Sequence, residues 1–254
     1  MTPIDAVLFD LDDTLFDQRV WLDGAWRSVA AAAQSRHGVD AARLLDALMS
    51  VAAEGSDRGH IIDRALARIG RTDVAVAPLV DVFRAYRPSR LSPFPGVAAA
   101  LSRLWARVPL ALVTDGDPGI QRAKLAALGL GHAFAAVVFS DELDGGRAAR
   151  KPNPAPFLHA ASLLGVTPKA VVVVGDRPEK DVDGAHAAGM RAIRVRTGEY
   201  RHTEGSETPW HDVPSAVAAA TLLELDLRGP SHSRGNSGRN STAISSRVEA
   251  EVAR

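Results

Sequence analysis

Two aspartates directly follow the first apolar run of the chain. The run Ile4–Phe9 is almost continuously apolar, as is typical of a strand buried in a parallel sheet, and it leads into Asp10 and Asp12. Carboxylates at the carboxyl end of such a strand lie in the crevice where open α/β sheets bind ligands, so these two can share one cation. An apolar run that ends in Asp is also typical of a turn or a helix N-cap, and alone it leaves the chemistry open.

A hydroxyl and exposed backbone amides follow the second apolar run, Val108–Val113. The segment consists of Thr114, Asp115 and Gly116. Such donors can spread negative charge over the oxygens of a phosphoryl group. Taken alone, Thr114 could equally be a helix cap or a β-branched strand residue.

Lys151 follows the third apolar run, Phe134–Phe139, and is notable because lysine is rare in this chain. Lysine occurs only at positions 124, 151, 169 and 180, and arginine supplies the other basic residues. A compact ammonium fits a phosphoryl oxygen inside a small pocket better than a planar guanidinium does. Lys151 is therefore a candidate phosphate ligand. The alternative is a solvated charge at the start of a helix that Lys151 and Pro152 would open.

The fourth candidate group follows the apolar run Ala170–Val174. Gly175 permits a tight turn and places Asp176 in the same crevice as Asp10 and Asp12. Oxygen ligands without soft donors suit Mg²⁺, which binds through one or two carboxylates together with a substrate phosphate. The sequence therefore predicts a magnesium site that Asp176 completes.

The four groups together resemble the ordered motifs of the haloacid dehalogenase-like superfamily. In chain order the motifs match DLDDT at residues 10–14, Thr114, Lys151, and Gly175-Asp176 with Asp181. The resemblance covers about residues 2–16 and 94–227. The long segment between the first two motifs lies where this superfamily carries a cap domain.

The resemblance implies that Asp10 is a nucleophile that forms an aspartyl-phosphate. Asp12 would act first as the general acid and then as the general base. The metal would bind the carboxylates of Asp10 and Asp176 and the backbone carbonyl of Asp12.

The resemblance also implies a phosphate site. Thr114 and Lys151 would bind the phosphoryl oxygens together with the segment Asp115-Gly116, and Asp181 would hold Lys151 in place. Many relatives carry Asn at the position of Asp115. We therefore expect the amide of Asp115 to face the phosphate while its side chain turns away.

The residue two positions after the nucleophile separates reaction classes. A phosphatase needs a carboxylic acid there to protonate the departing alkoxide and then activate water, which fits Asp12. A dehalogenase-like member would lack this group, and a phosphonatase-like member would need an imine-forming lysine, which the predicted cap does not contain. We therefore expect a magnesium-dependent phosphatase that acts on a small phosphomonoester. A phosphomutase and a catalytically silent binding protein are the alternatives.

Five apolar runs with helical patterns between most of them predict an α/β fold with a doubly wound, Rossmann-like parallel sheet. The runs are Ile4–Phe9, Val108–Val113, Phe134–Phe139, Ala170–Val174 and Ala192–Val195. The long gap after the first run contains the helical patterns Trp26–Ser35, Ala41–Ala53, His60–Ile69 and Val76–Tyr86. We therefore predict a helical cap domain at residues 17–92, inserted into a core of residues 1–16 and 93–227.

Composition limits the partners. Thirty basic and thirty acidic side chains balance, so no overall field draws the chain to nucleic acid or to an anionic membrane. The lack of cysteine excludes disulfides, thiolate zinc sites and cysteine nucleophiles. Because we find neither an apolar leader nor a membrane span, we expect a cytoplasmic protein. Residues 228–254, rich in Ser, Gly, Asn and Arg, predict a disordered tail, and the oligomeric state stays open.

Overall fold

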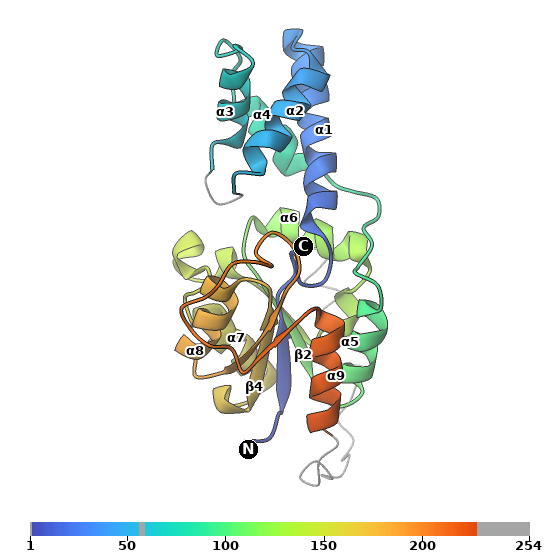
Figure 1. The fold of residues 1–254 in the computed structure, drawn as a ribbon, viewed down its shortest axis with the longest axis vertical. Helices are drawn as coiled ribbons and strands as arrows, with labels where there is room; N and C mark the ends of the chain where they lie inside the picture. Colours follow the sequence, from blue (N-terminus) through green and yellow to red (C-terminus); the bar gives the residue numbers. More distant parts are fainter. Residues whose placement is uncertain (1, 56–58, 228–254) are drawn as a thin grey trace. The chain divides into compact units, whose positions relative to one another are not determined.

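A six-stranded parallel sheet carries the four candidate motifs (Figure 1). The structure is a computed structural model, and it describes residues 2–55 and 59–227. The strands are β1 (Ala6–Phe9), β2 (Leu110–Thr114), β3 (Ala136–Phe139), β4 (Val171–Gly175), β5 (Arg191–Val195) and β6 (His211–Val213). Their order is β3-β2-β1-β4-β5-β6, and all neighbours are parallel. The predicted doubly wound α/β fold is confirmed, and β6 adds a strand that the sequence did not predict.

Helices cover both faces of this sheet, which explains why its central strands are continuously apolar (Figure 1). The helices are α5 (Val97–Trp105), α6 (Pro118–Leu128), α7 (Ala155–Leu164), α8 (Asp183–Ala187) and α9 (Ala216–Asp226). Helix α7 packs against β1, β2 and β3, and its Phe157 joins Leu8 and Val173 in one buried cluster. On the opposite face, α9 packs against α5, β4 and β5.

Local sequence signals set the ends of α6 and α7. Helix α6 begins at Pro118, where the side chain of Asp117 accepts a hydrogen bond from the amide of Ile120 at 3.1 Å. It ends before Gly129, which has a φ of +66°, and α7 likewise ends before Gly165 at +68°. Left-handed glycines of this kind are common helix stops because they carry no Cβ.

Between β1 and α5, the described residues form a helical insert with a hydrophobic core of its own. Its helices are α1 (Gln18–His37), α2 (Ala41–Ala52), α3 (Ile61–Arg68) and α4 (Ala77–Ala85). Residues Arg19–Ser89 form one compact unit, and the rest of the chain forms the other. Leu44, Leu48 and Leu66 are among the buried residues at the centre of the insert.

Helix α1 begins at Gln18, much earlier than the predicted start at Trp26. Gly24 lies inside it, and a Cβ at that position would lie 2.0 Å from the hydroxyl oxygen of Tyr86. Trp21 makes an edge-on ring contact with Tyr86, with ring centroids 5.8 Å apart. A glycine inside a helix costs about 0.5–1 kcal/mol, and here it leaves room for the close approach of Tyr86.

Two further sequence predictions concern the C-terminal tail and membrane-spanning helices. The predicted disordered tail, residues 228–254, lies outside the described residues. Within the described ranges, no helix combines the length and the apolar character needed to cross a membrane.

Candidate active site

The register of the sheet brings the first and fourth motifs to one place. Phe9, the last residue of β1, pairs with Leu112 of β2 and with Val174 of β4. The amide of Asp10 donates to the carbonyl oxygen of Val174 at 2.9 Å. Asp10 and Asp176 therefore leave two neighbouring strands at the same edge, and both are buried.

Asp10, Asp176 and Asp181 form a buried acidic cluster. One carboxylate oxygen from each residue lies within 4.8 Å of those of the other two. Burial raises the pKa of Asp10 to about 7, although Lys151 opposes this. Burial, followed by the charges of Asp10 and Asp181, raises the pKa of Asp176 well above its usual value. Hard carboxylate oxygens crowded with excess negative charge fit a divalent cation such as Mg²⁺.

Lys151 lies in the middle of this cluster, so the alternative of a solvated surface charge is wrong. It is only 5% exposed. Its Nζ donates to an oxygen of Asp10 and to an oxygen of Asp181, both at 2.6 Å. Burial opposes the charged ammonium, but Asp10, Asp181 and Asp115 together raise the pKa of Lys151 above its usual value. Lys151 also does not open a helix, because α7 begins at Ala155.

Gly175 makes room for the second partner of Lys151. A Cβ at position 175 would lie 2.3 Å from Cγ of Asp181. The other oxygen of Asp181 accepts a hydrogen bond from the amide of Arg177 at 3.0 Å, which fixes the carboxylate from the opposite side. The contact between Asp181 and Lys151 that the resemblance implied is therefore present in the structure.

The second motif lies at the end of β2. The buried hydroxyl of Thr114 accepts a hydrogen bond from Nε2 of Gln121 at 2.6 Å. The Asp115 carboxylate accepts from the backbone amide of Lys151 at 3.2 Å, so its side chain is turned toward the third motif. Gly116 has a φ of +123°, a backbone conformation that favours glycine.

The side chain of Asp12 is not part of the acidic cluster. It is held by two residues of α6 that the sequence analysis did not select, Gln121 and Lys124. The sequence does contain a signal for these two residues. Gln121 and Lys124 share the buried face of α6 with Leu125 and Leu128, and polar residues at such positions indicate a specific partner.

Asp13 fixes the backbone immediately after Asp12. It has a φ of +58° and is buried. One carboxylate oxygen accepts from the amide of Gln18 at 3.0 Å, and the other accepts from the amide of Glu199 at 3.0 Å. A Cβ on Gly198 would lie 2.1 Å from Cγ of Asp13, so glycine is required there. The loop after β5 thus packs directly on the first motif.

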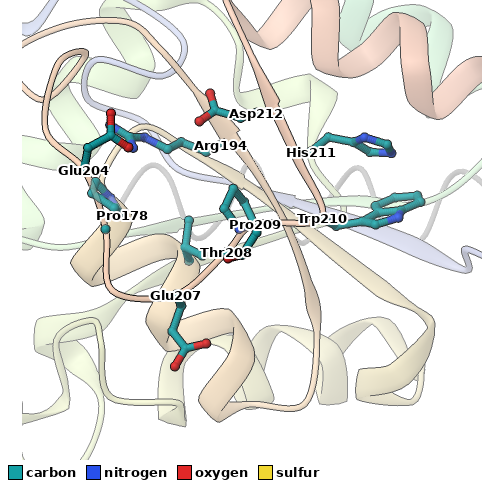
Figure 2. A pocket seen from close by; sticks show the side chains of 11 residues that line it. Pro178, Arg194, Glu204, Glu207, Thr208, Pro209, Trp210, His211 and Asp212 are labelled. Carbon is teal, nitrogen blue, oxygen red and sulfur yellow. The ribbon is translucent and has the colours of Figure 1, made fainter.

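A cavity of about 420 Å³ lies among residues of β5, β6 and the segment before β6 (Figure 2). Its lining includes Arg194, Glu204 and Asp212. Arg196 pairs with Asp212 at 2.6 Å and with Glu204 at 3.2 Å, while Arg194 donates to the carbonyl oxygen of Tyr200 at 2.9 Å. Within the described part of the chain, no candidate residue of the four motifs lines this cavity.

The fold and the site define a parallel α/β core with a buried carboxylate–lysine centre at the carboxyl ends of its strands. A family model described as haloacid dehalogenase-like hydrolase matches residues 4–189. The chain belongs to this family, and its helical insert lies between β1 and β2.

Several family members are similar to this chain over most of its length. A glyceraldehyde 3-phosphate phosphatase from Methanopyrus kandleri is 37% identical over 79% of this chain and 88% of its own. A phosphoserine phosphatase from Thermus thermophilus is 35% identical over 70% of this chain and 68% of its own. Among solved structures, a 2-haloacid dehalogenase from Pseudomonas syringae superposes with a TM-score of 0.59 at 25% identity, covering 87% of this chain and 99% of its own.

Proposed function

We propose that this protein is a Mg²⁺-dependent phosphatase that hydrolyses a small phosphomonoester through an aspartyl-phosphate on Asp10. One observation carries the proposal. A buried ammonium, Lys151, lies within hydrogen-bonding distance of Asp10, and a second carboxylate, Asp12, follows two residues later. The two phosphatases described above, which are named for glyceraldehyde 3-phosphate and phosphoserine, support the same reaction class.

The carboxylates of Asp10 and Asp176 and the backbone carbonyl of Asp12 would hold the Mg²⁺ ion. When bound, this ion neutralises the charge that would otherwise repel a phosphate from the acidic cluster. Lys151, the hydroxyl of Thr114 and the amides of Asp115 and Gly116 would donate hydrogen bonds to the phosphoryl oxygens. Donors fixed in a buried site stabilise the charge that develops during transfer.

The reaction would proceed in two chemical steps, and the second would return the enzyme to its starting form. In the first, an oxygen of Asp10 forms a bond to phosphorus as the bond between phosphorus and the alcohol oxygen breaks. The carboxylic acid of Asp12 gives its proton to the departing alcohol oxygen. In the second, the Asp12 carboxylate takes a proton from a water molecule. The water oxygen bonds to phosphorus as the bond between phosphorus and the Asp10 oxygen breaks, so inorganic phosphate leaves and the Asp10 carboxylate is regenerated.

Asp12 favours this reaction over dehalogenation, which the likeness to a 2-haloacid dehalogenase would otherwise suggest. A halide leaves without a proton, so a dehalogenase has no use for an acid beside the nucleophile. We also propose that residues 17–92 act as a cap domain that selects the substrate. Substitutions there should change KM ratios among phosphate esters more than they change turnover of an aryl phosphate, and an unchanged ratio throughout would oppose this role.

A panel of phosphorylated metabolites, assayed for phosphate release with Mg²⁺, tests the proposal. The panel should include phosphoserine, glyceraldehyde 3-phosphate, sugar phosphates and nucleoside monophosphates, with Asp10→Asn as the inactive control. Release of phosphate by the wild type alone supports a phosphatase. Isomerised sugar phosphates without released phosphate would indicate a phosphomutase, and no turnover of any ester would indicate a binding protein.

A further inference from the structure

One face of α6 holds the side chain of Asp12. Nζ of Lys124 donates to both carboxylate oxygens of Asp12, at 2.7 and 2.9 Å. Nε2 of Gln121 donates to one of the same oxygens at 2.8 Å. Three donated hydrogen bonds therefore restrain both oxygens, and the carboxylate cannot rotate freely while α6 stays in place.

The burial of Lys124 calls for a specific reason. Its side chain is only 3% exposed, and it shares the buried face of α6 with Leu125 and Leu128. Lysine is almost never buried unless it is paired, and an apolar residue would fill such a position more favourably. Helix formation and core packing therefore do not explain a lysine here, whereas a carboxylate that must be held in one orientation does.

Gln121 connects Asp12 to the second motif. Its amide nitrogen has two hydrogens, and the two acceptors within reach are Asp12 at 2.8 Å and the hydroxyl oxygen of Thr114 at 2.6 Å. One side chain thus fixes the distance between the proposed acid–base residue and a proposed phosphate ligand. An apolar residue of similar size would leave both groups without this shared donor.

We infer that Gln121 and Lys124 are positioning residues that aim Asp12 at the reacting oxygen. This inference rests on the proposed phosphatase function. Asp12 has to meet the leaving oxygen in the first step and the attacking water in the second, and small losses of orientation reduce such steps strongly. Lys124 pairs with the ionised form of Asp12, which is the form that the second step needs as a base.

Lys124→Met tests the inference, because methionine keeps much of the side-chain volume but donates no hydrogen bond. With Mg²⁺ and a saturating alkyl phosphate, we expect kcat to fall about 10- to 100-fold, the range seen when groups that orient catalytic ligands are lost. KM should stay close to the wild-type value, since Lys124 does not bind the substrate. The matched control is Lys169→Met at an exposed lysine, which should behave as wild type.

A double variant separates positioning from a general structural effect. If Lys124 acts through Asp12, then Lys124→Met should reduce kcat little further in an Asp12→Asn background, where kcat is the residual steady-state rate with the same alkyl phosphate for all four proteins. Losses that simply multiply would overturn the inference, as would unchanged kcat in Lys124→Met.

A further variant keeps the test open if Lys124→Met does not fold. Gln121→Leu removes the neutral donor without leaving a buried charge unpaired, and it should also lower kcat. Wild-type kcat in folded Gln121→Leu would then overturn the inference. A wild-type protein inactive on every phosphate ester would instead contradict the proposed function, so the two failures are distinguishable.

Discussion

Gly175 lies so close to Asp181 that even a methyl group would not fit between them, since a Cβ there would be 2.3 Å from Cγ of Asp181. Asp181 in turn accepts a hydrogen bond from Lys151. We therefore predict that Gly175→Ala displaces the Asp181 carboxylate and lowers kcat at least about tenfold. Steady-state kinetics with Mg²⁺ would measure this.

Gly129→Ala is the control for this prediction. Position 129 has open space around it but a φ of +66°, so alanine should destabilise the fold by about 1–2 kcal/mol and leave kcat unchanged. Equal kinetic losses in both variants would mean that general destabilisation, and not the contact with Asp181, explains the result.

Lys151→Arg should keep the positive charge but lose most activity. A planar guanidinium cannot occupy the small space between Asp10 and Asp181 or repeat the two hydrogen bonds of 2.6 Å. We expect Lys151→Ala to lower kcat by about 10²–10³-fold and Lys151→Arg to recover only part of that loss. The comparison requires variants that are saturated with metal and have the circular dichroism spectrum of the wild type. Lys169→Arg is the control at an exposed lysine. Full activity in Lys151→Arg would contradict a role for Lys151 in the site.

Asp12→Asn should affect alkyl and aryl phosphates differently. An activated aryl alcohol leaves without protonation, so the first chemical step should be nearly normal with an aryl ester and strongly slowed with an alkyl ester. Single-turnover measurements of alcohol release isolate this step. Equal slowing of both esters would be inconsistent with an acid role for Asp12.

Asp176→Asn should stabilise the protein when metal is removed. Burial raises the pKa of Asp176 in the folded state above the unfolded value of 3.8, so stability from this group is full at low pH and is lost as the pH rises through the folded pKa. In excess chelator, the variant should therefore gain stability over the wild type between pH 5 and pH 8. Urea unfolding at both pH values measures the difference.

Mg²⁺ should reverse the order of stability of these two proteins at pH 8. The ion binds the folded wild type and stabilises it in proportion to the logarithm of its concentration, whereas the variant lacks one ligand. If the stabilities of the wild type and Asp176→Asn depend on pH in the same way in excess chelator, then ionised Asp176 does not destabilise the folded protein, contrary to this prediction.

The positions of the first, second and fourth motifs could be predicted from the sequence because each directly follows an apolar run that is typical of a buried strand. Strand ends in a parallel sheet share one edge, so Asp10 and Asp176 could be placed together although they are far apart in the chain. The buried environment of Lys151 could not be deduced in the same way. Its position depends on a long-range contact with Asp181, which no local pattern specifies.

Two other features escaped the sequence analysis for physical reasons. Strand β6, His211–Val213, has only three residues, only one of which is buried, so it lacks the apolar pattern of the inner strands. Gln121 and Lys124 look like ordinary polar residues of a helix until the buried face of α6 is known. Their role depends on tertiary contacts with Asp12. In the sequence they appear only as two polar residues on the otherwise apolar face of a helix.

The central place of β1 has a consequence for the order in which the protein is made. Val7 pairs with Leu110 on one side and with Val172 on the other, so both neighbours of the nucleophile's strand leave the ribosome long after it does. At cellular elongation rates of about 5–20 residues per second, the second neighbour follows after a delay on the order of 10 s. The insert has a hydrophobic core of its own and can fold during that delay, while Ile4–Phe9 stays an unpaired apolar segment. We therefore expect the catalytic end of the nascent chain to be the part most dependent on protection from aggregation.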